Sequence, residues 1–276
     1  MNNQYEKAEK FRRAHAGTKI LVLPNAWDVA TARLFESCGF TAVATSSAAV
    51  AVSYGYRDGQ GLPLQDLVQT VERICSSVSL PVSVDIVAGY GANTREIEDS
   101  VTRIVGAGAV GVNIEDFEHS TGRLFDGDEQ AGKIEALRSL AGRVGVPFVI
   151  NARTDALRYH PGNRSEKFKE ALRRAERYRD SGADCVYPMG LTGEEEISKF
   201  VASISFPINV MVSKNTPTVQ RLESLGVRRL SFGPSAAYAA YGLLRRASAE
   251  ILEKGTFSLL TQDALTYDEL NKLGYR

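Results

Sequence analysis

Eight short apolar segments recur along the 276-residue chain, and each has about the length of one strand. Runs rich in valine and isoleucine suit strands of a parallel sheet that is covered on both faces. The segments span residues 19–24, 41–46, 81–85, 109–115, 147–153, 183–188, 207–212 and 227–232. Amphipathic helical stretches separate them, at residues 64–76, 96–105, 130–141, 165–180 and 218–225. Strand and helix alternating eight times predict an α/β fold, a (β/α)₈ TIM barrel, for which the length is typical.

The chain shows no linker, composition break or low-complexity segment. We therefore expect one barrel domain over residues 1–276. Beyond the eighth strand, residues 236–252 are rich in alanine, leucine and arginine and predict a long helix. Together with the tail at residues 255–276, this helix forms the expected C-terminal helical extension.

Charge and composition exclude several classes of protein. Lysine plus arginine equals aspartate plus glutamate at 33 each, which argues against a nucleic-acid partner or an anionic membrane surface. The three cysteines form no CxxC or Cys/His cluster, so a disulfide framework or structural zinc site is not expected. The charged N-terminal segment is not a secretory signal, and no apolar stretch reaches membrane-spanning length. We therefore expect a cytoplasmic protein.

Two acids stand at the ends of neighbouring predicted strands. Asp85 ends the third strand and Glu115 the fourth. Active sites of parallel barrels lie at the carboxyl ends of the strands, and Mg²⁺ prefers a few carboxylates with water and substrate oxygens. The pair therefore predicts a magnesium site. The alternative is that one or both acids cap the helices that follow.

Anion-binding groups follow two other strands. Arg153 ends the fifth strand, and its planar guanidinium suits a carboxylate or phosphonate. The alternative for Arg153 is an internal ion pair with Asp155, Glu115 or Asp85, and both roles are compatible. Ser46 and Ser47 end the second strand, where their hydroxyl and N–H groups suit a second anionic group of the substrate. Their alternative is to cap a turn.

Two polar loops are expected at the mouth of the barrel. Asp58 lies in a glycine-rich loop after the second strand. Residues 117–132, after the fourth strand, form a polar loop that contains His119 and Arg123 and is a candidate lid. A lone histidine in such a loop is more often solvated than catalytic, and both readings of His119 stay open here.

Several motifs, in this order, resemble the isocitrate lyase/phosphoenolpyruvate mutase superfamily. The closest resemblance is to its PNAWD-type, carboxyphosphonoenolpyruvate phosphonomutase-like members, over nearly the whole chain. The motifs are PNAWD at residues 24–28, TSSA at 45–48, GYRDG at 55–59, DIVAGYG at 85–91, NIED at 113–116 and NARTD at 151–155.

The resemblance implies a barrel whose last helix is swapped between partners, giving a homodimer or homotetramer. It implies Mg²⁺ and a small 2-oxo or 2-hydroxy acid as substrate. The metal would be held by Asp85 and Glu115, directly or through water, and Asp58 would join that network. Ser46, Ser47 and Ala48 would bind the carboxylate or oxo end of the substrate.

The resemblance also implies catalytic positions. Arg153 would clamp an anionic group, and Asp58 would act beside it. His119, Ser120 and Arg123 are the polar residues nearest to the loop positions where phosphonopyruvate enzymes carry a lysine and an asparagine, and His119 is the third candidate catalytic residue.

The chain departs from the superfamily pattern at three places. Val87 replaces an acid two residues after Asp85, and Met189 replaces a polar or acidic residue after the sixth strand. The loop at residues 117–132 contains neither the cysteine of isocitrate and methylisocitrate lyases nor a lysine. Those two lyase activities are therefore not expected.

The function that fits best is an Mg²⁺-dependent carbon–carbon lyase. It would cleave or decarboxylate a small 2-oxo (di)carboxylic acid through an enolate, as an oxaloacetate decarboxylase does. Decarboxylation needs no base before the bond breaks, so it tolerates the loss of the loop cysteine. One alternative is P–C chemistry on phosphonopyruvate, and another is a 2-oxo-acid-binding protein with little catalysis.

Overall fold

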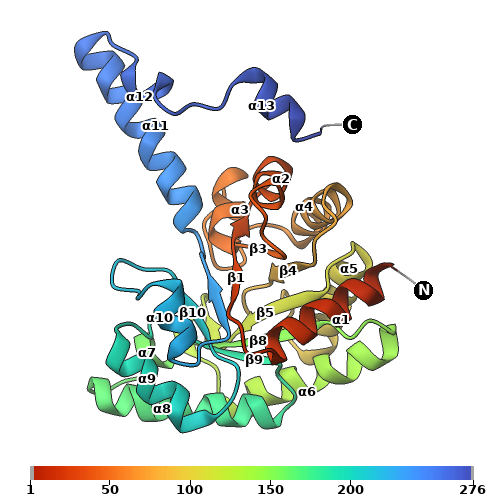
Figure 1. Ribbon diagram of the computed structural model, residues 1–276. Coiled ribbons are helices and arrows are strands. Elements are labelled where there is room, and N and C mark those ends of the chain that lie inside the picture. The colour runs from red at the N-terminus through yellow and green to blue at the C-terminus, as the bar shows by residue number, and fades with distance from the viewer. Residues whose placement is uncertain (1–2, 275–276) are drawn as a thin grey trace.

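The computed structural model describes residues 3–274, and eight parallel strand positions form its centre (Figure 1). The first position consists of β1 (Leu21–Leu23) and β2 (Asn25–Ala26), which Pro24 separates. The others are β3 (Val43–Thr45), β4 (Val82–Asp85), β5 (Gly111–Glu115), β8 (Val149–Thr154), β9 (Cys185–Pro188), β10 (Asn209–Met211) and β11 (Arg229–Ser231). Each lies within or overlaps one of the eight segments predicted from the sequence.

The strand order closes into a ring. One run of neighbours is β2-β3-β4-β5-β8-β9, and the other is β1-β11-β10. A bridge between Val186 and Ile208 joins β9 to β10, and the continuation of β1 into β2 closes the second seam. The predicted TIM barrel is confirmed.

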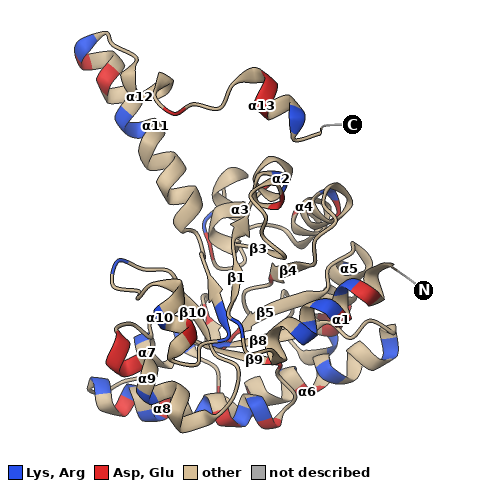
Figure 2. Ribbon diagram, viewed as in Figure 1, with Lys and Arg blue, Asp and Glu red and all other residues tan. Residues whose placement is uncertain are grey.

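Helices surround the barrel as an outer layer (Figure 1). They are α2 (Val29–Ser37), α3 (Ser47–Ser53), α4 (Leu64–Ser77), α5 (Thr94–Gly106), α6 (Gly127–Val144), α7 (Ala156–Tyr159), α8 (Arg164–Asp180), α9 (Glu194–Ile204) and α10 (Val219–Ser224). Acidic and basic side chains are interspersed along the outer helices α6 and α8 (Figure 2). Among the described residues, no helix combines the length and apolar character that crossing a membrane requires.

The main apolar core lies between the strands and the helices. Val84, Val112, Ile150 and Val186 are fully buried on this outer side of the barrel. The residues that alternate with them face the barrel interior, because successive strand side chains point to opposite faces. Those residues are largely polar: Ser83, Asp85, Asn113, Asn151, Arg153, Asn209, Arg229 and Ser231. The strands are therefore covered on both faces as predicted, but apolar on only one of them.

Helix α1 (Asn3–Ala16) supplies the floor of the barrel. Its Phe11 and His15 are buried, with ring centroids 4.7 Å apart. A methyl group at Gly111 would lie 2.8 Å from Phe11 Cε1, so the glycine lets the Phe11 ring approach β5 closely. The N-terminal end of the barrel is thus closed by residues far away in sequence.

Because His15 is buried, we expect the free energy of unfolding to fall as the pH becomes mildly acidic. Burial, and then Arg229, lower the pKa of His15 to about 3. Because the unfolded chain takes up a proton near pH 6.5 and the folded chain does not, this contribution to stability is lost as pH falls below 6.5. We expect about 2 kcal/mol to be lost between pH 7.5 and pH 5. Urea unfolding across this range should show a flatter pH dependence for His15→Gln, but an unchanged one for the control His160→Gln. Equal slopes for His15→Gln and the wild type would contradict the assignment.

A C-terminal arm leaves the barrel after β11 (Figure 1). It consists of α11 (Ser235–Lys254), α12 (Ser258–Thr261) and α13 (Tyr267–Lys272). Only Ala237 and Ala247 are buried along α11. The arm returns toward α2, where Arg33 Nη1 donates to the carbonyl oxygen of Leu273 at 2.9 Å. The predicted helical extension is present; residues 1, 2, 275 and 276 of the predicted domain lie outside the described residues.

Candidate active site

A cavity of about 300 Å³ opens at the carboxyl ends of the strands and continues into the barrel interior. It brings together most of the residues predicted for the site. Those that line it are Ser46, Ser47, Ala48, Asp58, Asp85 and Arg153. Glu115 and His119 lie directly behind Arg153, as shown below. The cavity therefore joins groups that are more than 100 residues apart in sequence.

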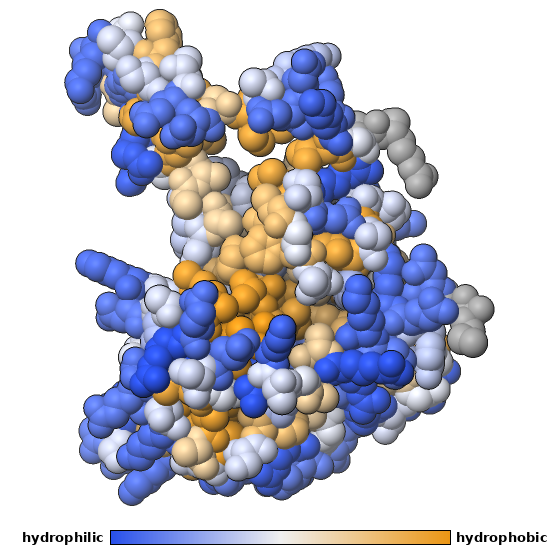
Figure 3. All heavy atoms as spheres, in the orientation of Figure 1, coloured by the Kyte–Doolittle hydropathy of each residue, from blue (hydrophilic) through white to orange (hydrophobic). Residues whose placement is uncertain are grey.

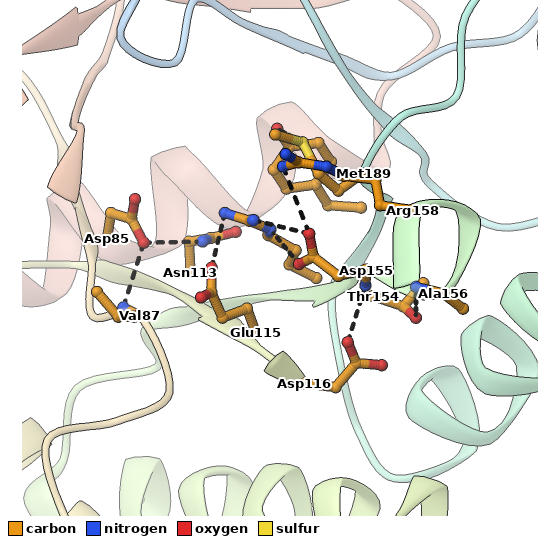
Figure 4. A network of polar contacts seen from close by, with 12 residues as sticks. Asp85, Val87, Asn113, Glu115, Asp116, Thr154, Asp155, Ala156, Arg158 and Met189 are labelled. Carbon is orange, nitrogen blue, oxygen red and sulfur yellow. Dashed lines mark hydrogen bonds and ion pairs between the residues drawn. The ribbon is translucent and has the colours of Figure 1, made fainter. Parts of the chain in front are cut away.

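Asp85 is the carboxylate on the β4 side of the cavity. Its Oδ2 accepts a hydrogen bond from the Ser47 N–H at 3.1 Å. Its Oδ1 accepts from Asn113 Nδ2 at 3.0 Å and from the Val87 N–H at 3.3 Å (Figure 4). Asp85 does not cap the next helix, because the N-cap of α5 is Asn93. These bonds leave the carboxylate on the cavity wall with a fixed orientation.

Arg153 lies between the buried carboxylates of Glu115 and Asp155. Its Nε and Nη2 donate to the two oxygens of Asp155 at 2.6 and 2.9 Å, and its Nη1 lies 2.6 Å from Glu115 Oε2. Burial opposes the charge of Arg153, but Glu115 and Asp155 hold its pKa well above the usual range. The internal ion pair and the cavity position are therefore both present.

His119 is an exposed residue, but its ring is bonded to the site. Its Nε2 lies 2.6 Å from Glu115 Oε1, and this hydrogen bond raises the pKa of His119. Burial raises the pKa of Glu115, against the opposing effects of Arg153 and His119. A methyl group at Gly59 would lie 2.5 Å from His119 Cγ, so the loop that carries Asp58 packs directly on this ring. His119 thereby connects the two predicted loops.

The loop at residues 117–132 contains more structure than the sequence indicated. It begins with a short antiparallel hairpin of β6 (Phe117–Glu118) and β7 (Arg123–Leu124), and α6 starts within it at Gly127. Arg123 and His119 are both exposed, and the His119 ring packs edge-on against Phe117 with ring centroids 4.9 Å apart. A role of this segment as a lid stays a prediction.

The second acid of the NIED motif lies outside the cavity. Asp116 Oδ2 accepts from the Tyr178 hydroxyl at 2.7 Å and from Arg174 Nη1 at 2.9 Å. Its Oδ1 accepts from the Asp155 N–H at 2.8 Å (Figure 4). Asp116 therefore fixes the backbone at Asp155, which in turn orients Arg153. This network was not predicted from the sequence.

The TSSA segment forms the start of α3. Ser46 is its N-cap, and Ser46 Oγ accepts from the Ala49 N–H at 3.4 Å. The capping alternative therefore holds for Ser46, although the residue also lines the cavity. Ser47 contributes its N–H to Asp85, so this segment positions the carboxylate as well as the cavity wall.

Several residues that line the cavity were not predicted from the sequence, and Tyr187, Asn209 and Arg229 are among them. Tyr187 lines the cavity on β9, and its hydroxyl donates to Met189 Sδ at 2.9 Å. Its ring centroid lies 5.8 Å from Arg153 Cζ. The alternation of inward-facing positions along β9 is the signal that would have identified it.

The donor set fits Mg²⁺ bound mainly by water and substrate. Within residues 3–274, no three His, Cys, Asp or Glu side chains converge as a ready metal cage. Mg²⁺ needs only one or two protein carboxylates with waters and substrate oxygens. Asp85 and Asp58 line the cavity, whereas both oxygens of Glu115 already pair with Arg153 and His119. A contribution of Glu115 would therefore pass through water.

Comparison with known proteins places the chain in a family. The family model for phosphoenolpyruvate phosphomutase matches residues 11–252. A 2-methylisocitrate lyase of Aeropyrum pernix is 30% identical over 245 residues, which cover 86% of this chain and 77% of that protein.

Solved structures agree with this placement. A putative lyase/mutase from Burkholderia cenocepacia has a TM-score of 0.90 and 30% identity, over 99% of this chain and 96% of that one. A phosphonopyruvate hydrolase in complex with oxalate and Mg²⁺ has a TM-score of 0.84 and 27% identity, over 97% and 94% of the two chains. The chain therefore belongs to the phosphoenolpyruvate phosphomutase family and is an enzyme of the isocitrate lyase/phosphoenolpyruvate mutase superfamily of Mg²⁺-dependent lyases.

Proposed function

We propose that this enzyme is an Mg²⁺-dependent lyase that cleaves or decarboxylates a small 2-oxo (di)carboxylic acid through an enolate. The observation that carries this proposal is the cavity itself. It presents the Asp85 carboxylate and the Arg153 guanidinium to the same small volume, which suits one metal and one anionic substrate. Oxaloacetate is the substrate that we would expect first.

The residues of the chain have distinct roles in this proposal. Asp85, with Asp58 beside the cavity mouth, would hold the metal, and Glu115 would contribute through water. Mg²⁺, when bound, supplies positive charge that stabilises an enolate oxygen. The hydroxyls of Ser46 and Ser47 would orient the carboxylate or oxo end of the substrate.

Arg153 would stabilise the negative charge that develops as the bond breaks. Glu115 and Asp155 fix its guanidinium before substrate arrives, so no reorganisation is needed during the reaction. His119, the third proposed catalytic residue, holds Glu115 on the opposite side from Arg153. The absence of a cysteine from residues 117–132 separates this chain from a cysteine-dependent methylisocitrate lyase.

A substrate panel tests this function. Pyruvate release is measured from oxaloacetate, phosphonopyruvate and methylisocitrate, each with Mg²⁺ and with EDTA. We expect Mg²⁺-dependent pyruvate from oxaloacetate and little from methylisocitrate. Release from phosphonopyruvate alone would replace carbon–carbon by P–C chemistry. Binding of 2-oxo acids without turnover of any analogue would replace the lyase by a binding protein.

We also propose a homo-oligomer in which α11 packs on a second copy of the chain. The arm exposes large apolar side chains: Tyr238, Leu244, Leu252, Phe257 and Tyr267. Apolar surface lies along this arm and on the face below it (Figure 3). Contiguous exposed apolar surface of this kind is typical of protein interfaces.

Light scattering measures the oligomer directly. We expect two or four times the 30.1 kDa mass of one chain. A charge at a buried interface position is strongly unfavourable, so Leu244→Asp should shift the mass toward one chain. Ser76→Asp, at an exposed position on α4, is the matched control and should leave the mass unchanged. A wild type with the mass of a single chain would contradict the proposal.

A further inference from the structure

Arg229 is a buried cation at the inner end of the cavity. It begins β11, where it pairs in register with Leu21 of β1 and Asn209 of β10, and only 2% of its surface is exposed. Within residues 3–274, no Asp or Glu oxygen lies within ion-pair distance of its guanidinium. Arg153 and Arg174, the other deeply buried arginines near the site, each pair with two carboxylates. Arg229 is therefore unusual in this barrel.

The contact that Arg229 does make leaves its charge uncompensated. Its Nη1 lies 3.3 Å from His15 Nε2, and His15 Nδ1 lies 2.9 Å from the carbonyl oxygen of Phe11. The arrangement assigns the proton of His15 to Nδ1, so that Nε2 accepts from Arg229. A neutral histidine satisfies one donor of the guanidinium but does not balance its charge.

The other groups around Arg229 do not balance the charge either. Apart from His15, Cys185 and Tyr187 of β9 are the titratable side chains that act most strongly on Arg229, and burial raises the pKa of both, so they are neutral. Asp85 acts on Arg229 more weakly and is already bonded by Ser47, Val87 and Asn113. Burying an unpaired charge is strongly unfavourable, so such a group indicates a missing anion.

Several buried polar atoms of residues that line the cavity have no partner in the described part of the chain. Ser83 Oγ, Asn151 Oδ1, Asn209 Oδ1 and Arg229 Nε are buried and have no hydrogen-bond partner in the protein. All four side chains line the cavity, and they come from four different strands. Because buried polar atoms nearly always have partners, these atoms indicate a place that water or the polar atoms of a ligand occupy. The two asparagine oxygens accept hydrogen bonds, whereas Ser83 Oγ and Arg229 Nε can donate to an anion.

We propose that Arg229 forms a second anion subsite at the floor of the cavity and that it binds the distal carboxylate of a small 2-oxo dicarboxylic acid. This proposal rests on the proposed function, because the 2-oxo end of the same molecule would lie toward Asp85 and Ser46. The Ser83 hydroxyl, which has no partner among the described residues, would donate a further hydrogen bond to the distal carboxylate. The Nδ2 groups of Asn151 and Asn209 already donate to Asn113 and Ser231. The subsite therefore selects dicarboxylates over monocarboxylates of the same length.

Calorimetry with matched ligands tests the subsite in the presence of Mg²⁺. 2-Oxoglutarate and 2-oxovalerate have five carbons each and differ only by the distal carboxylate; 2-oxoadipate and 2-oxohexanoate extend the comparison to six. We expect the wild type to bind the diacid at least about tenfold more tightly than the monoacid in one of these pairs. Arg229→Met should remove this difference while leaving the Kd of the monoacid within about twofold.

Two further variants sharpen the result. Arg229→Lys keeps the charge but not the planar fork, so it should retain part of the preference for the diacid. Arg228→Met is the matched control, because the adjacent side chain does not line the cavity, and it should leave every Kd unchanged. Equal affinities for diacid and monoacid in both pairs, or an equal loss of both in Arg229→Met, would overturn the subsite.

Thermal unfolding separates ligand binding from a structural role. Removing an unpaired buried charge should leave the Tm of ligand-free Arg229→Met equal to or above that of the wild type. A lower Tm, or a variant that does not fold, would assign Arg229 to the structure and overturn the proposal. Turnover of oxaloacetate without any diacid preference would reject the subsite alone. Failure of every 2-oxo acid and of oxalate to bind would reject the proposed function with it.

Discussion

Asp85→Ala should lower kcat/KM by roughly a thousandfold or more while the barrel stays folded. The variant removes the carboxylate that faces the cavity from β4, and with it the main protein ligand proposed for Mg²⁺. Removal of a group that organises charge stabilisation in an active site commonly has an effect of this size. Steady-state rates on the substrate identified by the panel measure it directly.

The control and the readouts for Asp85→Ala separate chemistry from folding. Asp99→Ala removes an exposed carboxylate on α5 and should leave both rate and stability unchanged. Mn²⁺ binding followed by electron paramagnetic resonance should weaken in Asp85→Ala alone, because the loss is one of metal affinity. Rates of Asp85→Ala equal to those of the wild type would remove Asp85 from the metal site.

The fold was predictable because its determinants are local. Each strand is a short apolar run, and each is followed by an amphipathic helix, so the barrel follows from a pattern that can be counted. The position of Asp85 and Arg153 was predictable for a related reason: both stand at carboxyl ends of strands, which meet at one rim. The start of α4 was predicted to the residue, at Leu64.

The sequence offered Asp155, Glu115 and Asp85 as possible partners of Arg153, but it did not decide between them, because packing sets the contacts. Glu115 and Asp116 are adjacent, yet strand alternation sends Glu115 to Arg153 and Asp116 to Arg174 on the opposite face. His119 reaches Glu115 only because the β6–β7 hairpin turns the chain back. No local pattern specifies either contact.

Contacts at the floor of the barrel were even less predictable from the sequence. His15 and Arg229 are 214 positions apart, and they meet because α1 closes the N-terminal end of the barrel. In the sequence, Arg229 stands directly after Arg228 in the segment at residues 227–232, where nothing marks which of the two faces inward. A charged residue in a buried strand indicates a special role, but only the register of the strand shows to which face its side chain points.

The second large effect is expected for Arg153→Met, on both activity and stability. Arg153 is the shared partner of Glu115 and Asp155, whose side chains are 2% and 0% exposed. Without Arg153 these carboxylates would be left buried with much weaker compensation, so the variant should lose about 3–5 kcal/mol of unfolding free energy. Turnover should fall as well, because the positive charge at the cavity wall is gone. Urea unfolding and steady-state kinetics measure the two losses separately.

A double variant distinguishes the two losses. In Arg153→Met/Asp155→Asn one of the two unpaired charges is removed, so part of the lost stability should return. Activity should not return, because it depends on the guanidinium rather than on the stability of the barrel. Arg143→Met breaks an exposed ion pair with Glu98 and is the matched control, with an expected change below about 1 kcal/mol. Recovery of turnover together with stability in the double variant would show that Arg153 acts only as a structural cation, and catalysis would then have to rely on the Asp85 side of the cavity.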